Sequence, residues 1–175
     1  MVRLVLAGTI AGLQGAARAE TGPGAGPDFG PQVLVFDSVM PMAEIQTNLD
    51  GVFQRQERSQ FGTGRYAFLF KPGTYDVDVN VGFYTQVLGL GRMPGDTRIR
   101  GAVHSEADWM RGNATCTFWR ACENLAVEVA SKAPMNWAVS QGTSFRRMHV
   151  SGDLNLWDGG WSSGGFMADS RIDGQ

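Results

Sequence analysis

The sequence predicts an all-β fold in which short strands stack as the repeating coils of a solenoid, with one helix near the start. Glycine accounts for 24 of 175 residues and only 18% of residues are charged, which favours a turn-rich β protein over a helical bundle. Four β-branched residues centre short strand patterns at intervals of 28, 23 and 22 residues: Ile99, Val127, Val150 and Ile172. These intervals lie at the low end of solenoid periods, so each fits one coil. A β-sandwich with regularly spaced strands is the alternative.

The beginning of the chain is typical of a secretory signal peptide. One arginine, Arg3, precedes an apolar or small run from Leu4 to Leu13, and Ala17-Arg18-Ala19 matches a cleavage pattern. We therefore expect residues 1–19 to be a signal peptide and the protein to be secreted, extracellular or periplasmic. The apolar run is too short to span a membrane. Residues 20–28 are rich in glycine and proline and predict a flexible leader, so the folded domain covers residues 29–175.

The first folded elements are a strand and the only convincing helix. Val33–Phe36 forms a short apolar run, and residues 42–55 follow with a helical period. Pro41 suits the first helical position, and Ser38 is close enough upstream to help cap the helix. The apolar face consists of Ile45, Leu49, Val52 and Phe53. The solvent face consists of Gln46, Asn48, Asp50, Gln54 and Gln56.

The stretch from Arg65 to Gly101 organises the rest of the chain. Residues 66–70 are apolar on both faces, as in a strand buried within a sheet stack, and Pro72-Gly73 ends this strand. The next strand alternates, with an aromatic or valine at positions 75, 77, 79 and 81 and a polar residue between each pair. We expect further short strands at residues 118–119, 137–139 and 166–168, with Trp119 and Trp137 in the core.

This order of elements resembles the start of right-handed parallel β-helix proteins of the pectate-lyase-like superfamily. The matching residues are Ala43-Glu44-Ile45-Gln46 on the helix, Phe70-Lys71-Pro72-Gly73-Thr74-Tyr75, and Val87-Leu88-Gly89-Leu90-Gly91. The resemblance implies that the helix caps the open end of a right-handed β-helix. It also implies a secreted protein active on carbohydrate, although this fold carries many chemistries.

The chain ends within its repeat pattern, at Gln175. Solenoids need a polar terminal cap over the last coil, so we expect residues 29–175 to be the N-terminal part of a β-helix truncated at its C-terminus. A carbohydrate-binding module of the discoidin type accompanies some proteins of this kind, and such a module would be missing from this chain.

Composition and spacing argue against several other functions. The net charge of −2 lacks the basic footprint of a nucleic-acid-binding protein. His104 and His149 have no partner at zinc-site spacing, so we expect no metal and no cofactor. Cys116 and Cys122 are the only cysteines. Export would permit a disulfide between them, but an extended segment would hold them about 20 Å apart, which favours separate thiols.

Carboxylates near the end of the chain are the candidate catalytic residues. Glycoside hydrolysis needs two, one acting as acid and one as base or nucleophile. Asp169, Arg171 and Asp173 alternate on one face, where Arg171 would tune the pKa of its neighbours. Four residues of extended strand separate Asp169 from Asp173 by about 13 Å. Asp158 is therefore the better partner for Asp169, and solvated surface residues are the alternative for each.

Two tryptophans add a candidate substrate-binding surface. Trp157 and Trp161 flank a glycine pair, and an exposed indole face suits the face of a sugar ring. Burial in the core is the equal alternative. The sequence thus predicts a polysaccharide-active protein, foremost a glycoside hydrolase. The alternatives are a polysaccharide lyase and a β-helical protein that binds carbohydrate or lies at a surface without catalysis.

Overall fold

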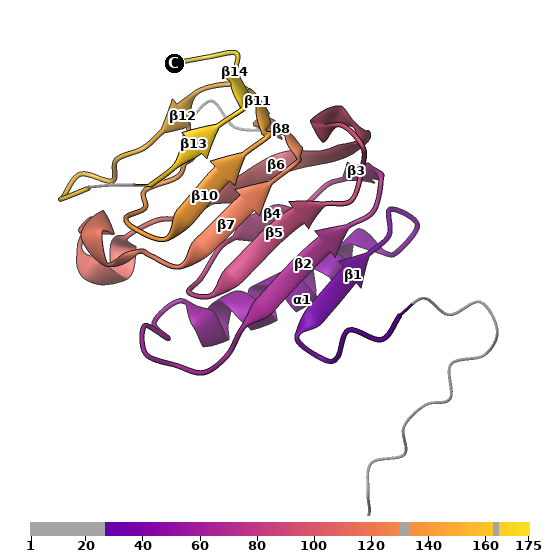
Figure 1. Ribbon diagram of the computed structural model, residues 1–175, viewed down its shortest axis with the longest axis horizontal. Coiled ribbons are helices and arrows are strands. Elements are labelled where there is room, and N and C mark those ends of the chain that lie inside the picture. Colours follow the sequence, from indigo (N-terminus) through magenta and orange to yellow (C-terminus); the bar gives the residue numbers. More distant parts are fainter. Residues whose placement is uncertain (1–26, 130–133, 163–164) are drawn as a thin grey trace, which may run out of the picture.

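The computed structural model describes residues 27–129, 134–162 and 165–175. It is mostly β, with parallel sheets and one α-helix (Figure 1). The first sheet contains, in spatial order, β1 (Val33–Phe36), β2 (Tyr66–Phe70), β5 (Thr85–Gly89), β7 (Arg120–Glu123), β10 (Thr143–Arg146) and β13 (Met167–Ala168). The second contains β3 (Gly73–Tyr75), β4 (Asp78–Asn80), β6 (Thr97–His104), β8 (Ala126–Val129), β11 (His149–Ser151) and β14 (Arg171–Ile172). The third pairs β9 (Met135–Asn136) with β12 (Leu154–Asn155).

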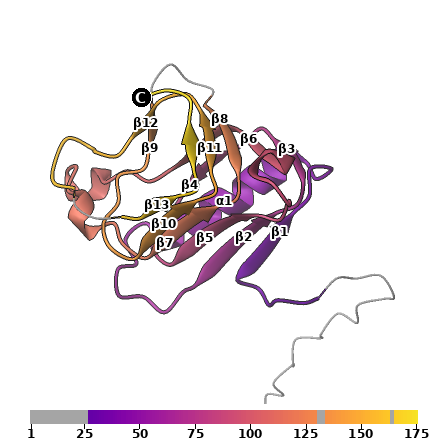
Figure 2. The same cartoon turned by 45° about the horizontal axis from the view of Figure 1, so that its top comes forward.

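Every pairing between these strands within the described ranges is parallel. From β5 onward the chain passes repeatedly from a strand of the first sheet to a strand of the second, and β9 and β12 of the third sheet precede the returns to β10 and β13. Each strand pairs with the equivalent strand of the next passage. Figure 2 shows the two sheets on opposite sides of the core, with α1 (Met42–Gln56) at the end where the chain begins. A β-sandwich is wrong, because its sheets are antiparallel.

The four repeat centres lie in one register through the second sheet. Ile99 pairs with Val127, Val127 with Val150, and Val150 with Ile172. The first three are fully buried and Ile172 is half-buried. Tyr75 extends the column by pairing with Ile99. The segments spaced by 28, 23 and 22 residues therefore pair as neighbouring parallel strands of one sheet, with their β-branched centres in one register.

The helix is confirmed, and its apolar face packs into the core through Ile45, Leu49 and Val52. Two glutamines predicted on its solvent face instead bond to backbone groups of the chain that faces the helix. The Gln46 amide pairs with both the N–H (2.9 Å) and the C=O (2.8 Å) of Asp78 on β4. Gln56 is 3% exposed and donates to the carbonyls of Phe83 and Gly64. An amide side chain has the same donor and acceptor as a peptide unit, so Gln46 satisfies backbone groups of β4 and Gln56 satisfies carbonyls of the loops that precede β2 and β5.

The cap and two of the three further short strands differ from expectation. Pro41 is the N-cap, without a side-chain hydrogen bond, so Ser38 does not cap the helix. Residues 118–119 precede β7 and residues 137–139 follow β9, whereas β13 does fall within 166–168. Trp137 is buried as expected, but Trp119 is 55% exposed. Trp119 leaves the strand path because its backbone is left-handed, with φ at 57°.

Both cysteines are free thiols, as the extended spacing favoured. Cys122 is fully buried, and its Sγ lies 3.6 Å from Sδ of Met148 on the neighbouring coil. The predicted signal peptide and most of the predicted leader, residues 1–26, lie outside the described residues. Within the described part of the chain, no helix has the length and apolar character needed to cross a bilayer.

We expect Val127→Ala to lower the free energy of unfolding by about 2 kcal/mol, because it removes two methyl groups from a fully buried column. Glu128→Ala is the matched control on the same strand. Its carboxylate points outward to Arg98 in a surface ion pair, so its loss should change stability by less than about 0.5 kcal/mol. Urea unfolding of both variants measures the difference, and equal effects would contradict an inward column at this register.

Candidate functional site

The outer face of the second sheet is charged and internally paired. Arg100 binds Asp76 from the neighbouring coil at 2.6 Å, Arg98 binds Glu128 at 2.5 Å, and His149 lies 2.8 Å from Asp173. Opposite charges in adjacent coils thus neutralise each other along this face. It is a solvated surface with few unpaired groups to offer a ligand.

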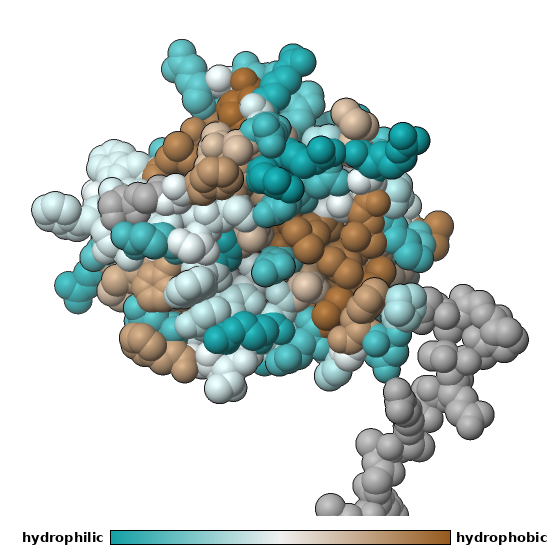
Figure 3. All heavy atoms as spheres, in the orientation of Figure 1, coloured by the Kyte–Doolittle hydropathy of each residue, from teal (hydrophilic) through white to brown (hydrophobic). Residues whose placement is uncertain are grey.

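The outer face of the first sheet has a different character, because hydrophobic residues and an open cleft lie on it. Figure 3 views this face, where hydrophobic residues gather over β1 and β2. Beside them lies an open cleft of about 880 Å³. We call it the aromatic cleft. Its lining includes Arg65, Tyr66, Ala67, Tyr84, Gln86, Trp119, Arg120, Ala121, Gly142, Thr143, Ser144 and Phe166.

The cleft exists because one outward row of the sheet is made of small residues. Ala67, Gln86, Ala121 and Ser144 pair in register across β2, β5, β7 and β10. Three of the four side chains are an alanine or a serine, so little fills the space above the strands. The aromatic residues stand at the ends where these strands begin, and they form a wall beside the small floor.

Two residues of that wall have left-handed backbones. Tyr84 has φ at 54° and Trp119 at 57°, each directly before its strand. This conformation costs about 1–2 kcal/mol for a residue with a side chain. Backbone bonds hold the corner, since Tyr84 N–H donates to the carbonyl of Trp119 and Trp119 N–H to that of Gln141. Strain of this kind clusters at functional sites.

Neighbouring residues fix both rings. The guanidinium of Arg65 lies 3.5 Å from the centroid of the Tyr84 ring, and the Tyr84 hydroxyl donates to the carbonyl of Gln60. The Trp119 indole lies flat beside Gly142, where an added Cβ would come within 3.0 Å of the ring. The wall is therefore preorganised, with Trp119 exposed to solvent.

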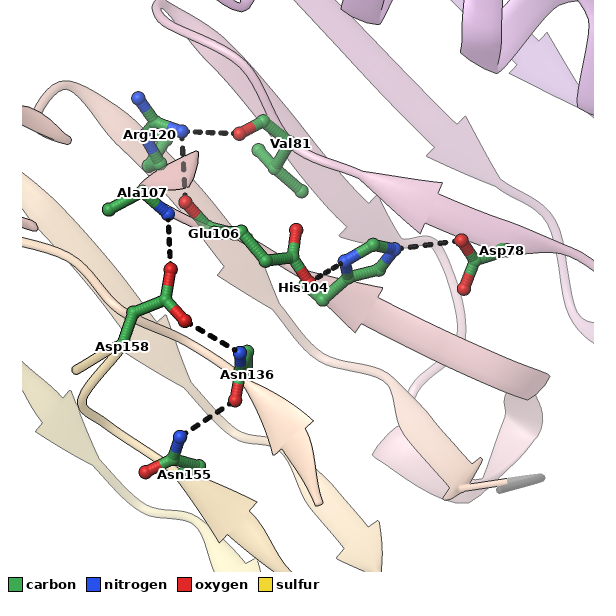
Figure 4. A network of polar contacts seen from close by, with 10 residues as sticks. Asp78, Val81, His104, Glu106, Ala107, Arg120, Asn136, Asn155 and Asp158 are labelled. Atoms are coloured by element: carbon green, nitrogen blue, oxygen red, sulfur yellow. Dashed lines mark hydrogen bonds and ion pairs between the residues drawn. The ribbon is translucent and has the colours of Figure 1, made fainter. Parts of the chain in front are cut away.

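Arg120 lies beneath this cleft with its side chain turned into the core. Its Nη1 donates to the carbonyl of Val81 and to Oγ of Ser105, while Nε and Nη2 have no partner within the described structure (Figure 4). Burial lowers the pKa of the Arg120 guanidinium to about 9. The ring of Phe83, 4.8 Å away, supplies a cation–π contact in place of a carboxylate.

Asp158, one of the three predicted catalytic residues, anchors a loop. Its carboxylate accepts a hydrogen bond from the backbone N–H of Ala107 at 2.7 Å and one from the Asn136 amide at 3.4 Å (Figure 4). Asn136 in turn accepts from Asn155. Asp158 therefore joins the segment after β6 to the segment after β12.

Asp169 and Asp173 lie on either side of β14. Asp169 is exposed at a corner with φ at 51°. Asp173 accepts from His149 at 2.8 Å and from Arg171 at 2.6 Å. These two hydrogen bonds, that from His149 foremost, hold the pKa of Asp173 below its usual range. No described hydrogen bond or ion pair joins Asp158, Asp169 and Asp173 to one another, and none of the three lines the aromatic cleft.

Trp157 and Trp161 are 56% and 76% exposed, so the core alternative is wrong for both. Trp157 Nε1 donates to the carbonyl of Gly160 at 2.6 Å, which tethers that ring to its own loop. Neither tryptophan lines the aromatic cleft. The substrate-binding roles predicted for Trp157, Trp161 and Arg171 stay predictions.

Sequence reasoning missed a histidine held between two acids. Nε2 of His104 lies 2.8 Å from Asp78, and Nδ1 lies 2.5 Å from Glu106 (Figure 4). Burial alone would lower the pKa of His104, but the hydrogen bonds with Asp78 and Glu106 outweigh it and raise the pKa to about 9. An alternating pattern with Asp78 and His104 both facing outward was the available signal, but the pairing of β4 with β6 could not be read from sequence.

Within the described ranges, no group of three or more potential ligands could hold a metal ion.

Comparison with known proteins points to β-glucan enzymes. No protein-family model matches the sequence. Over 153 residues the chain is 55% identical to an exo-beta-1,3-glucanase of Streptomyces sp. (strain SirexAA-E / ActE), a match that covers 86% of this chain and 25% of the relative. The solved structure of sacteLam55A from Streptomyces sp. SirexAA-E superposes with a TM-score of 0.78 at 54% identity, covering 85% of this chain and 27% of that one. A variant of sacteLam55A in complex with glucose gives 0.77 at 54% identity, covering 83% and 26%. The chain thus spans about a quarter of the length of the proteins it matches.

The resemblance to the pectate-lyase-like superfamily is wrong, because these relatives are similar to nearly the whole described chain and are a β-1,3-glucanase and sacteLam55A. The motifs behind that resemblance are local. Pro72-Gly73 turns the chain from the first sheet to the second, and Gly89 lies where an added Cβ would come within 2.0 Å of the Asn124 carbonyl. Such residues suit any stack of close parallel coils beside a helix.

We expect the stabilising contribution of His104 to depend on pH. Its pKa is raised from about 6.5 in the unfolded chain to about 9 in the fold. The contribution is therefore complete below about pH 6.5 and is lost as the pH rises through 9. The stability difference between the wild type and His104→Gln should shrink by at most about 1.4 kcal/mol per pH unit across this window. Urea unfolding from pH 6 to pH 10 measures it, with His149→Gln to separate the effect of the second histidine, and a constant difference would contradict the protonated cluster.

Proposed function

We propose that this protein is a glycoside hydrolase that acts on β-1,3-glucan. The observation that carries the proposal is the 55% identity to an exo-beta-1,3-glucanase over 86% of the chain. At this identity the coil interiors and the corners are expected to superpose, in line with the TM-score of 0.78 to sacteLam55A. Because the match covers only a quarter of the relative, activity and substrate are inferred for the protein and are not assigned to particular residues by similarity.

The fold we propose for it is a right-handed parallel β-helix with α1 covering its first coil. Alternation of the chain between two parallel sheets supports this, since each return to the same sheet completes a coil. Connections between parallel strands of one sheet are right-handed in nearly all proteins. The bonds from Gln46 to the backbone of β4 and from Gln56 to the turn before β5 support a capping role for the helix.

We also propose that the protein is exported. The apolar run at Leu4–Leu13 and the cleavage pattern at residues 17–19 support this. A polysaccharide is too large to enter a cell freely, so a glucanase outside the cytoplasm meets its substrate directly.

Among the predicted carboxylates, Asp169 is the foremost candidate for a catalytic role. Its side chain is exposed, and within the described ranges no hydrogen bond or ion pair engages it. Asp158 and Asp173 are both committed to structural partners. The lowered pKa of Asp173 would suit a base or nucleophile and not a general acid.

A non-catalytic carbohydrate-binding role for the described part of the chain is the second candidate. It is favoured by the aromatic cleft, whose lining includes no aspartate or glutamate. Glycoside hydrolysis ordinarily needs two carboxyl groups flanking the scissile bond, so this cleft can hold a sugar without cleaving it.

We expect the protein expressed from its complete reading frame to release glucose from soluble β-1,3-glucan. The assay follows glucose and reducing ends over time, with β-1,4-glucan and pectin as control substrates. Glucose should be the first product, because an exo enzyme removes terminal units. Cleavage of either control polymer with no action on β-1,3-glucan would overturn the proposal.

If Asp169 is catalytic, Asp169→Asn should lower kcat by orders of magnitude while the Tm stays nearly unchanged. The carboxylate is exposed, so the fold loses little when it becomes an amide, whereas acid–base or nucleophilic catalysis loses its group. Asp153→Asn is a suitable control, since the Asp153 carboxylate accepts only the backbone N–H of Gln175 among the described residues. Retained turnover in Asp169→Asn would remove this residue from the mechanism.

A further inference from the structure

We propose that the aromatic cleft binds a β-1,3-linked gluco-oligosaccharide against the exposed face of Trp119, at a site that holds the sugar and does not cleave it. The choice of sugar rests on the proposed function. The site itself rests on the shape, the aromatic wall and the polar groups of the cleft.

The shape fits a short saccharide. About 880 Å³ lies within the range of ligand sites. The small floor row runs from Ala67 on β2 to Ser144 on β10, crossing four strands at right angles to their direction. Adjacent strands lie about 4.8 Å apart, so the floor is about 14 Å long and accommodates two to three sugar rings.

The wall offers one free stacking surface. The Tyr84 ring is already covered by the Arg65 guanidinium. One face of the Trp119 ring packs against Gly142, and the residue remains 55% exposed. An exposed, preorganised indole suits the apolar face of a glucose ring. The left-handed backbone of Trp119 turns the ring toward the cleft, whereas an extended backbone would keep it in line with the strand.

The polar groups suit a neutral ligand. Gln86 is the one long side chain of the floor row and is exposed. Its amide both donates and accepts, as sugar hydroxyls do. The guanidinium of Arg65 is occupied by the carbonyls of Gly62 and Gly64, and Arg120 is buried. Among the described residues that line the cleft there is no carboxylate, so the lining itself supplies no acid or base for hydrolysis.

Trp119→Gly is the sharpest test, because glycine adopts the left-handed conformation without strain. The variant should keep its Tm within a few degrees and lose at least about tenfold in affinity for β-1,3-glucan, as expected when one stacking ring is removed. Affinity is measured as retardation in cold native gels containing soluble β-1,3-glucan, with β-1,4-linked hydroxyethylcellulose as the comparison. Phe61→Ala is the matched control, since Phe61 is 89% exposed and lies outside the cleft lining.

A second variant addresses the cleft without touching Trp119. Ala121→Phe places a ring on the floor of the cleft, from an outward position on β7, and should also abolish retardation. Unchanged retardation of both variants would overturn the proposal even if the protein hydrolyses β-1,3-glucan.

Conversely, retardation that both variants abolish would support the cleft even if no glucose is released, so the two proposals fail separately. If the wild type shows no retardation, and Trp119→Gly instead changes its elution volume in size-exclusion chromatography, the cleft is a protein interface and the proposal is wrong.

Discussion

The requirement that successive parallel strands of each sheet return to the same register governs the rest of the structure. Ile99, Val127 and Val150 stack only if every coil turns at equivalent positions. After the strands of the first sheet, the turn is made by left-handed residues at Asn124, Arg147 and Asp169. Successive corners are joined by backbone bonds, as from Asn124 N–H to the Arg146 carbonyl and from Arg147 N–H to that of Ala168. A corner residue cannot turn its side chain into the core, so each corner also determines what the surface presents.

The sequence predicted those parts of the fold that depend on periodicity. Three such patterns reflect burial: the apolar period of the helix, the alternation from Tyr75 to Val81, and the spacing of Ile99, Val127 and Val150. The order of apolar and polar residues along the chain follows burial directly. The aromatic cleft could not be predicted in this way. It depends on the sign of φ at Trp119, and an aromatic residue gives no warning of a left-handed backbone. It also depends on Ala67 and Ala121 lying in one row, although they are far apart in sequence and joined only through the pairings of β5.

The glutamines of α1 show a second limit of pattern reading. Gln46 and Gln56 fall on the polar side by residue type, yet their amides bond to the backbone of Asp78 and Phe83. A parallel sheet exposes unpaired peptide groups at its first strand, and burying them without partners would be costly. An amide side chain resolves this, because it offers one donor and one acceptor in peptide-like geometry. A glutamine can therefore face the protein interior here, because it bonds backbone groups that an apolar side chain would leave without a hydrogen-bond partner.

The corner before the strands of the first sheet distinguishes stability from function. Four left-handed residues occupy it, namely Tyr84, Trp119, Gly142 and Gly165. Stability alone would favour glycine at all four, since a side chain there costs about 1–2 kcal/mol. The two glycines conform to this, and Gly142 in addition leaves room for the Trp119 ring. The two aromatic residues do not conform, and Trp119 recovers little by burial because more than half of it is exposed. The strained backbone of Trp119 positions its rigid apolar ring beside the row of small residues on the sheet. Without that ring, the row would be an open sheet surface with no wall.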